Sequence, residues 1–313
     1  MLGAGGAVGH AFHAGVLAAL EERTGFDPRD AEIIIGTSAG SIVGALLRAG
    51  VGVEDLVEGT VGHSVPEEMK SRFAAARRSS NERAQAMPRN RGLRLGFSSP
   101  GILAEVARRP WRVRPGAVAA ALLPAGRVPT SVITDWLELV LDRWPDRQLR
   151  VCAVSRSTGR RVVFGPEGGP PPAVAVAASC AVPGLFAPVV VDGVEYVDGG
   201  VHSPTNADLA AGLGLDVVVV SSPMSAARPL RPGLDLPGRQ LARLTLSREV
   251  ASLRRQRIPT LVFQPTAADR QVMGLNAMDR SRRDPVTRQA RKSALERMDR
   301  PEAAAALALL AED

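Results

Sequence analysis

Residues 31–47 read Ala-Glu-Ile-Ile-Ile-Gly-Thr-Ser-Ala-Gly-Ser-Ile-Val-Gly-Ala-Leu-Leu, and the rest of the chain is organised around this stretch. The isoleucines at 33–35 predict a short buried strand, because a run of β-branched apolar residues is typical of a strand that is covered on both faces. From Ser41 onward, small and apolar residues follow a helical spacing, which predicts a packed helix. The stretch therefore predicts a strand that turns directly into a helix.

A serine flanked by glycines occupies that turn. Gly36 and Gly40 have no side chains to obstruct a sharp bend, and we expect Ser38 at its tip in a strained backbone conformation. The serine hydroxyl would then lie beside the positive N-terminal end of the helix, which is how a serine is presented as a nucleophile. Gly-x-Ser-x-Gly alone is a weak pattern in a chain with 31 glycines, and many such serines only cap helices. The predicted strand and helix on either side favour the catalytic interpretation.

A second glycine-rich turn lies at residues 3–9, and a helix is expected from Ala11 to Arg23, within which His13 packs or bonds locally. Such a turn can hold a phosphate, bind a dinucleotide or form an oxyanion hole. The Gly-Lys-Ser/Thr ending of a phosphate loop is missing, and Ala4 replaces the first glycine of a dinucleotide fingerprint. The short path to Ser38 favours the oxyanion hole, and an ordinary tight turn is the alternative. Only two residues precede the turn, so either the strand expected before it is very short or the recorded start omits part of it.

The length and composition of the chain limit the classes of protein to which it can belong. With 313 residues, of which 45% are apolar, the chain is long enough for one large α/β domain or two smaller ones. No apolar run is long enough to span a membrane, and the first residues lack the features of a secretory signal. We therefore expect a cytoplasmic protein, or one peripheral to the inner face of the membrane. Cys152 and Cys180 lie in apolar contexts and are expected to be buried thiols.

The net charge is +7, and nearly all of the basic residues are arginines spread over the whole chain. A positive charge favours anionic surfaces, either phospholipid headgroups or nucleic acid. Aromatic residues make up only 4% of the chain, which gives little support for stacking on bases. We therefore expect no nucleic-acid partner, and a nucleic-acid binder remains a minor alternative.

A serine hydroxyl needs a base in contact with it, and the chain offers few candidates. A predicted strand ends in Asp198, and Gly199 and Gly200 after it let other backbone approach the carboxylate closely. No histidine follows His202, so the chain lacks the histidine near the C-terminus that completes the order Ser, Asp, His in an ordinary α/β-hydrolase. Either Asp198 acts on Ser38 directly or His202 lies between them, and we favour the direct pair. A simple turn-forming Asp-Gly is the structural alternative.

We expect a catalytic core over residues 1–225 that carries a helical, basic cap or insertion at about 66–148. Residues 226–313 are expected to add a strand and helices that complete or flank the same domain. A helix at Leu241–Arg257 between two predicted strands reads as a crossover, which is consistent with a parallel sheet. A further helix is expected over residues 206–212.

Three ordered blocks of the sequence carry a more specific signal. They are Gly5-Gly6-Ala7-Val8-Gly9 running into Ala14-Gly15-Val16-Leu17, then Gly36-Thr37-Ser38-Ala39-Gly40-Ser41, and finally Ala178-Ser179-Cys180-Ala181-Val182-Pro183-Gly184-Leu185-Phe186 leading to Tyr196-Val197-Asp198-Gly199-Gly200-Val201. Together they resemble the motifs of the bacterial patatin-like phospholipases. The resemblance is good over about residues 3–60 and 150–222 and loose elsewhere.

The resemblance implies a three-layer α/β/α sandwich with a mainly parallel central sheet and a helical insertion. It implies that Ser38 is the nucleophile and Asp198 the general base, with backbone N–H groups of Gly5, Gly6 and Ala7 as the oxyanion hole. It also implies no metal, no cofactor and lipid acyl esters as substrates. Two positions depart from the family pattern: Ala4 stands in place of a glycine, and Val8 in place of a frequent basic residue of this loop. The second departure raises the question of what braces the loop.

From these observations we expect a serine lipid acyl hydrolase that forms an acyl-enzyme, with a lipid or phospholipid substrate and peripheral contact with a membrane surface. Two alternatives stay open. One is a catalytically silent lipid-binding or membrane-binding protein on the same fold. The other is an acyltransferase, which differs only in the acceptor of the acyl group.

Overall fold

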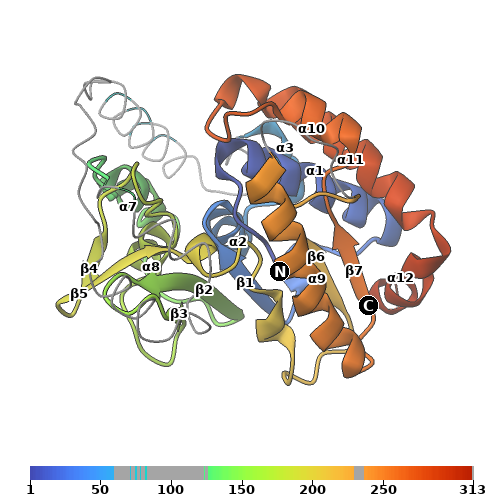
Figure 1. The fold of residues 1–313 in the computed structure, drawn as a ribbon, viewed down its shortest axis with the longest axis horizontal. Helices are drawn as coiled ribbons and strands as arrows, with labels where there is room; N and C mark the ends of the chain where they lie inside the picture. The colour runs from blue at the N-terminus through green and yellow to red at the C-terminus, as the bar shows by residue number, and fades with distance from the viewer. Residues whose placement is uncertain are drawn as a thin grey trace.

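The structure, a computed structural model, describes residues 1–59, 126–228 and 236–311, together with the isolated positions 71, 75, 78, 82 and 123. Most of the predicted cap at 66–148 therefore lies outside the described residues. The described chain is a three-layer α/β/α sandwich in which helices cover both faces of a central sheet (Figure 1). This architecture confirms the predicted fold class.

The sheet has a parallel centre and an antiparallel edge. Its strands are β1 (Ile33–Thr37), β2 (Gln148–Ser155), β3 (Arg161–Phe164), β4 (Val189–Val191), β5 (Val194–Asp198), β6 (Val218–Ser221) and β7 (Thr260–Phe263). β1 and β2 pair in parallel, as do β6 and β7, whereas β2 pairs antiparallel with both β3 and β5, and β4 with β5. Leu2 forms parallel bridges to Gly36 and to Ser221, so this one residue joins the two parallel pairs.

The α-helices are α1 (Gly6–Thr24), α2 (Ala39–Arg48), α3 (Val53–Glu58), α7 (Ser131–Leu137), α8 (Pro172–Ser179), α9 (Leu236–Arg255), α10 (Ala267–Met273), α11 (Arg283–Met298) and α12 (Ala304–Leu310). Short 3₁₀ turns are η1 (Pro28–Asp30), η3 (Gly199–Val201), η4 (Ala207–Ala210), η5 (Arg280–Arg282) and η6 (Pro301–Ala303). No helix in the described part of the chain is both long enough and apolar enough to cross a membrane.

Alternating side chains of β6 and β7 bind the two helical layers. Val218 and Val220 of β6 pack against α9, whereas Leu261 and Phe263 of β7 pack in a cluster with α1 and α11. In Figure 1, α9 crosses in front of β6, and α11 lies along α1. Each strand turns one apolar face toward α9 and the other toward α1 and α11, so burial of these side chains holds the sheet between the two helical layers.

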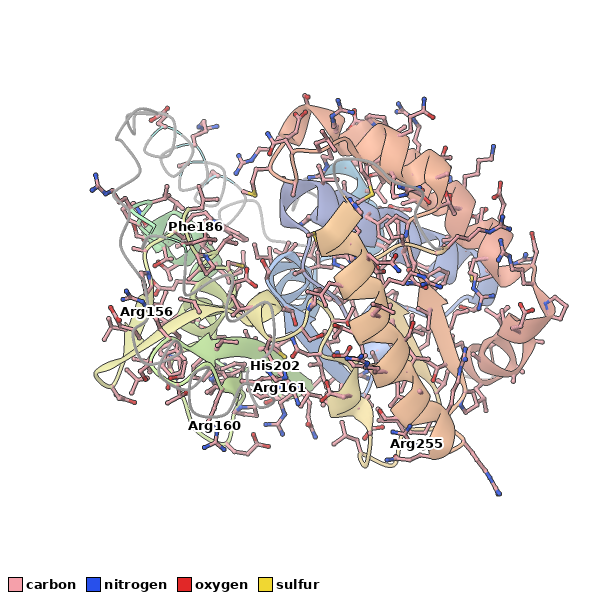
Figure 2. All side chains as sticks on the ribbon, viewed as in Figure 1. Arg156, Arg160, Arg161, Phe186, His202 and Arg255 are labelled. Atoms are coloured by element: carbon pink, nitrogen blue, oxygen red, sulfur yellow. The ribbon has the colours of Figure 1, made fainter. Side chains whose placement is uncertain are left out.

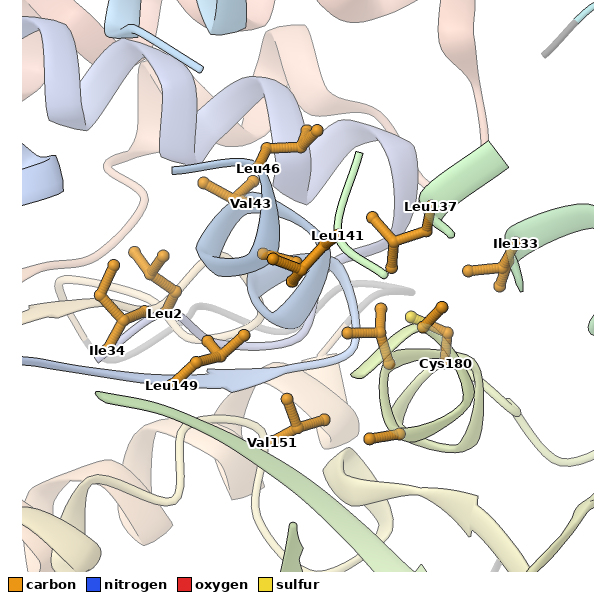
Figure 3. Close-up of a cluster of buried hydrophobic side chains, with 14 of the residues drawn as sticks. Leu2, Ile34, Val43, Leu46, Ile133, Leu137, Leu141, Leu149, Val151 and Cys180 are labelled. Carbon is orange, nitrogen blue, oxygen red and sulfur yellow. The ribbon is translucent and has the colours of Figure 1, made fainter. Parts of the chain in front are cut away.

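A third apolar cluster lies beneath the serine turn. It contains Leu2, Ile34 of β1, Val43 and Leu46 of α2, and Leu149 of β2, with side chains of α7 and α8 completing it (Figure 3). All of these side chains are buried. The helix predicted after Ser41 is therefore held by its apolar face, as the spacing of small and apolar residues indicated.

Two predicted helix boundaries are wrong. The first helix begins at Gly6 rather than at Ala11, so residues 6–9 of the predicted turn are already helical. The helix expected over 206–212 is only the 3₁₀ turn η4, since Asn206 has a positive φ of 51° and Gly212 interrupts the chain again at φ 83°. β2 and β3 form an antiparallel hairpin.

Candidate active site

The serine turn has the strained geometry that its glycines predict. Ser38 follows the last residue of β1 and is the N-cap of α2, with φ 53° and ψ −120°, a conformation that costs a non-glycine residue about 1–3 kcal/mol. A Cβ at Gly40 would overlap the backbone carbonyl of Leu2, and one at Gly36 would lie 2.5 Å from the Cα of Ser41. Both glycines are therefore required by close backbone contacts.

Asp198 is the last residue of β5 and is almost fully buried, with 4% of its surface exposed. The N–H of Gly200 donates a hydrogen bond of 2.7 Å to its Oδ1 atom. A Cβ at Gly199 would overlap the backbone carbonyl of Cys152. Gly199 thus lets the chain turn directly against β2, and Gly200 lets its own N–H reach the carboxylate.

The pairing of β2 brings Ser38 and Asp198 together. Thr37, the last residue of β1, pairs with Cys152, and Asp198 pairs with the next residue of β2, Ala153. β3 pairs with residues 151–154 of β2 and so occupies one of its edges. Of the β2 residues that pair with β3, two also pair with β1 and two also pair with β5, so β1 and β5 both lie on the opposite edge of β2. They therefore run toward each other along β2 and end at adjacent positions.

The electrostatic surroundings of Asp198 are those of a weakly acidic carboxyl group. Burial raises its pKa from 3.8 to about 6, and hydrogen bonds from the Ser38 side chain and from the Gly200 N–H act in the opposite direction. His202 is not among the groups that shift this pKa. The Ser38 side chain thus lies close enough to Asp198 to lower its pKa.

The glycine-rich turn contains a row of backbone N–H groups without acceptors. The N–H of Ala4 donates to the carbonyl of Pro204, and that of Val8 donates to the carbonyl of Ala277. Between them, the N–H groups of Gly5, Gly6 and Ala7 have no acceptor within the described residues. At the start of a helix such groups are free to bind an anion, as an oxyanion hole requires.

The turn contacts both of the other blocks. The carbonyl of Leu2 accepts a hydrogen bond of 2.9 Å from the N–H of Thr37, and the carbonyl of Gly3 accepts one of 3.2 Å from the N–H of Gly40. A Cβ at Gly200 would lie 3.3 Å from the Cβ of Ala4. The start of the glycine-rich turn therefore lies against both the serine turn and the segment that follows Asp198.

Sequence reasoning missed several supporting groups. The N–H of Ser38 donates a hydrogen bond of 2.8 Å to the Oγ of Ser179, which is fully buried at the end of α8. The Nδ2 of Asn206 donates to the Oγ1 of Thr37 at 3.0 Å. The N–H of Ala39 is a further candidate oxyanion donor, because it follows the nucleophile at the start of a helix. One signal was available: Ser179 is the polar residue in an otherwise small and apolar run.

An ion pair supports the segment after Asp198. Arg161 contacts Asp208 at 2.7 Å and donates to the Oδ1 of Asn206 at 3.1 Å. Figure 2 shows Arg156, Arg160 and Arg161 in the part of the molecule that contains β3, β4 and β5, and Arg255 at the end of α9. Within the described ranges, no group of three His, Cys, Asp or Glu side chains is placed to hold a metal ion.

Comparison with known proteins gives two findings. The sequence profile of a family described as patatin-like phospholipase matches residues 1–211, which include every candidate site residue. Among solved structures, the type III effector protein ExoU is similar at 18% sequence identity and a TM-score of 0.40. That similarity covers 96% of this chain and 52% of ExoU, so the chain spans about half the length of the effector.

Proposed function

The chain belongs to the patatin-like phospholipase family, and on this premise we propose that it is a serine hydrolase of lipid acyl esters. In this proposal Ser38 is the nucleophile and Asp198 the general base. The observation that carries it is that Ser38, in a strained turn, lies close enough to lower the pKa of the buried Asp198 carboxyl group, which burial raises to about 6. A base with that pKa is largely ionised at neutral pH yet still accepts a proton readily.

In the first half of the reaction, the Asp198 carboxylate accepts the proton of the Ser38 hydroxyl as Oγ attacks the ester carbonyl carbon. The carbonyl oxygen becomes an oxyanion, which the N–H groups of Gly5, Gly6 and Ala7 stabilise. Loss of one such donor typically costs about 3–4 kcal/mol of transition-state stabilisation. The intermediate collapses, the C–O bond to the alcohol breaks, and Asp198 returns the proton to the leaving oxygen.

In the second half, Asp198 takes a proton from water, and the resulting hydroxide attacks the acyl carbon of the acyl-enzyme. Collapse of the second intermediate breaks the bond to Oγ, and the proton returns to Ser38. The products are a fatty acid and the free enzyme. If an alcohol took the place of water, the same steps would make the protein an acyltransferase.

The test is turnover of p-nitrophenyl butyrate and of a phospholipid by the wild type, Ser38→Ala and Asp198→Asn. We expect both variants to lose nearly all activity and Ser38→Ala to lose labelling by a fluorophosphonate. Ser41→Ala is the matched control, because Ser41 is a buried serine of the same turn whose hydroxyl donates to the carbonyl of Ser38. Full activity in either dyad variant would refute the mechanism. A wild type that binds liposomes but neither turns over nor labels would favour the catalytically silent alternative.

We also propose that residues 226–313 complete the same domain as residues 1–225, as the sequence indicated. Two contacts support this. Thr287 of α11 donates to the carbonyl of Ala11 in α1, and the carbonyl of Ala277 accepts from the N–H of Val8 beside the glycine-rich turn. Deletion of residues 226–313 should therefore abolish folding of the remaining chain, measured by circular dichroism.

We further propose that the loop 274–279, between α10 and η5, contacts the lipid surface. Leu275 on this loop is 73% exposed, more than any other large apolar side chain in the described chain. The sulfur of Met278 would lie 2.9 Å from a Cβ at Gly6, so the loop borders the glycine-rich turn. An exposed apolar side chain beside a lipid-cleaving site is well placed to enter a bilayer surface.

The expected result of Leu275→Asp is weaker sedimentation with phosphatidylglycerol vesicles and slower hydrolysis of vesicle lipid. Turnover of the soluble ester should stay within about twofold, because Leu275 lies outside the dyad and the N–H row. Leu213→Asp, another exposed leucine, is the control. Equal vesicle binding by Leu275→Asp and the wild type would refute this contact.

A further inference from the structure

His13 is a fully buried histidine that the proposed mechanism does not use. It lies in α1 between apolar residues, and 0% of its surface is exposed. Burial lowers the pKa of its ring to about 4, so the ring is neutral at physiological pH. A polar ring in such a place needs hydrogen bonds at both of its nitrogens.

Both nitrogens have partners. Nε2 lies 2.7 Å from the carbonyl oxygen of Gly3, and Nδ1 lies 2.8 Å from the Oγ of Ser221, the last residue of β6. A carbonyl oxygen only accepts, so Nε2 must carry the hydrogen. In the neutral ring, Nδ1 is then unprotonated and accepts from the Ser221 hydroxyl. The two contacts therefore fix the tautomer.

The carbonyl oxygen of Gly3 accepts hydrogen bonds from two different parts of the site. It accepts from His13 and also from the N–H of Gly40 at 3.2 Å, while the N–H of Gly3 donates to the carbonyl of Ser221. Its orientation sets the direction of the chain two residues before the N–H of Gly5. Glycine residues have little conformational preference of their own, so this turn depends on such outside contacts for its shape.

Val8 cannot supply this support, because its side chain is apolar and buried in the cluster between α1 and α11. Packing at Gly3 is tight: a Cβ there would lie 2.9 Å from the carbonyl oxygen of Pro204. With Pro204 on one side and His13 holding the carbonyl on the other, the peptide between Gly3 and Ala4 has a single orientation.

We propose that His13 is a positioning residue of the oxyanion hole: by donating from Nε2 to the carbonyl of Gly3, it aims the N–H groups of the glycine-rich turn at the developing oxyanion. Ser221 assists by holding the ring in the tautomer that can donate. The proposal rests on the proposed function, since it assigns His13 a part in stabilising the oxyanion of that reaction.

Two substitutions of His13 by amide residues test whether the hydrogen bond to Gly3 matters, rather than the imidazole ring itself. In His13→Gln the side-chain amide reaches the place of Nε2, so the hydrogen bond to Gly3 is kept. In His13→Asn the amide reaches only the place of Nδ1, so the bond to Gly3 is lost. We expect His13→Asn to lower kcat by about 10- to 100-fold with KM within about twofold, because a misaimed donor costs less than an absent one. His13→Gln should stay within about threefold of the wild type, since the donor remains.

A trifluoromethyl ketone inhibitor, whose adduct carries an oxyanion, gives a readout that loss of stability alone does not change. Its inhibition constant should rise in His13→Asn in proportion to the loss of kcat/KM. Val16→Ala, which truncates a fully buried side chain of the same helix, is the control for destabilisation and should leave kcat unchanged. Full kcat in His13→Asn, or an equal loss in His13→Gln, would overturn the proposal.

Amide hydrogen exchange over residues 3–9 tests the same idea without catalysis. Exchange at Gly3 and Ala4, whose N–H groups donate to the carbonyls of Ser221 and Pro204, should be faster in His13→Asn than in His13→Gln or the wild type. If the wild type neither turns over esters nor labels with a fluorophosphonate, the proposed function fails, and the exchange pattern still decides whether His13 holds the turn. Identical exchange in all three proteins would overturn the positioning role.

Discussion

Replacement of Asp198 by Asn is expected to remove catalysis and, at the same time, to stabilise the protein at neutral pH. The carboxyl group is 4% exposed, and burial raises its pKa from 3.8 to about 6. The protein therefore keeps an ionised group in surroundings that favour its neutral form. An amide has the same shape, accepts from the N–H of Gly200 through its oxygen, and carries no charge.

The size of the effect follows from the pKa difference. Between about pH 3.8 and pH 6 the folded protein holds a proton that the unfolded chain has released, so the free energy of unfolding falls as the pH rises through this window. The full difference, reached above pH 6, is about 3 kcal/mol at 1.36 kcal/mol per pKa unit. The amide introduced by Asp198→Asn does not titrate, so the free energy of unfolding of this variant should not fall through this pH window.

Urea unfolding followed by tryptophan fluorescence, repeated at several values between pH 4 and pH 8, measures the effect. The unfolding free energy of Asp198→Asn minus that of the wild type should increase across this range by about 2.4 kcal/mol, since part of the full difference is already present at pH 4. Asp192→Asn, in the turn between β4 and β5, controls for removal of one negative charge. A difference for Asp198→Asn that stays constant or shrinks with rising pH would show that burial does not raise this pKa.

Three other predictions concern Asp198 and the turn that contains Ser38. The kcat/KM of the wild type for a soluble ester should rise with pH to half its maximum near pH 6 and then level off, because Asp198 must be ionised to accept a proton; a rate independent of pH between 5 and 8 would contradict this. Ser38→Gly should be more stable to urea than Ser38→Ala by about 1–2 kcal/mol, since glycine accepts a positive φ without strain, and equal stabilities would refute the strain. Ser179→Ala should lower stability by about 1–3 kcal/mol and also lower kcat, because it leaves the buried N–H of Ser38 without an acceptor; unfolding and steady-state kinetics at the wild-type level would argue against that role.

The sequence was sufficient to predict the features that depend on local pattern. The three isoleucines of β1, the glycines around Ser38 and the small residues of α2 each specify one conformation, and neighbouring residues agree with one another. The ordered spacing of the blocks then predicted Asp198 as the partner of Ser38. That the two strands end at adjacent positions followed only from the pairing of β2 in the structure.

Contacts between residues far apart in the chain were not predictable in this way. Ser179 is 141 positions from Ser38, and Ser221 is 208 positions from His13. The sequence around a serine or histidine in an apolar stretch does not indicate which distant residue will be its hydrogen-bond partner. The helix expected over 206–212 failed for a related reason: Asn206 bonds to Thr37 across the site, and this tertiary contact outweighs local helix preference.

The head-to-head arrangement of β1 and β5 on one edge of β2 means that backbone pairing alone sets the spacing between hydroxyl and carboxylate. Each residue of a strand advances the chain by about 3.3 Å, so a slip of one position in either pairing would separate the two groups by that amount. A change in the length of the chain between β1 and β2 that leaves both pairings intact should therefore preserve the distance between the reactive groups.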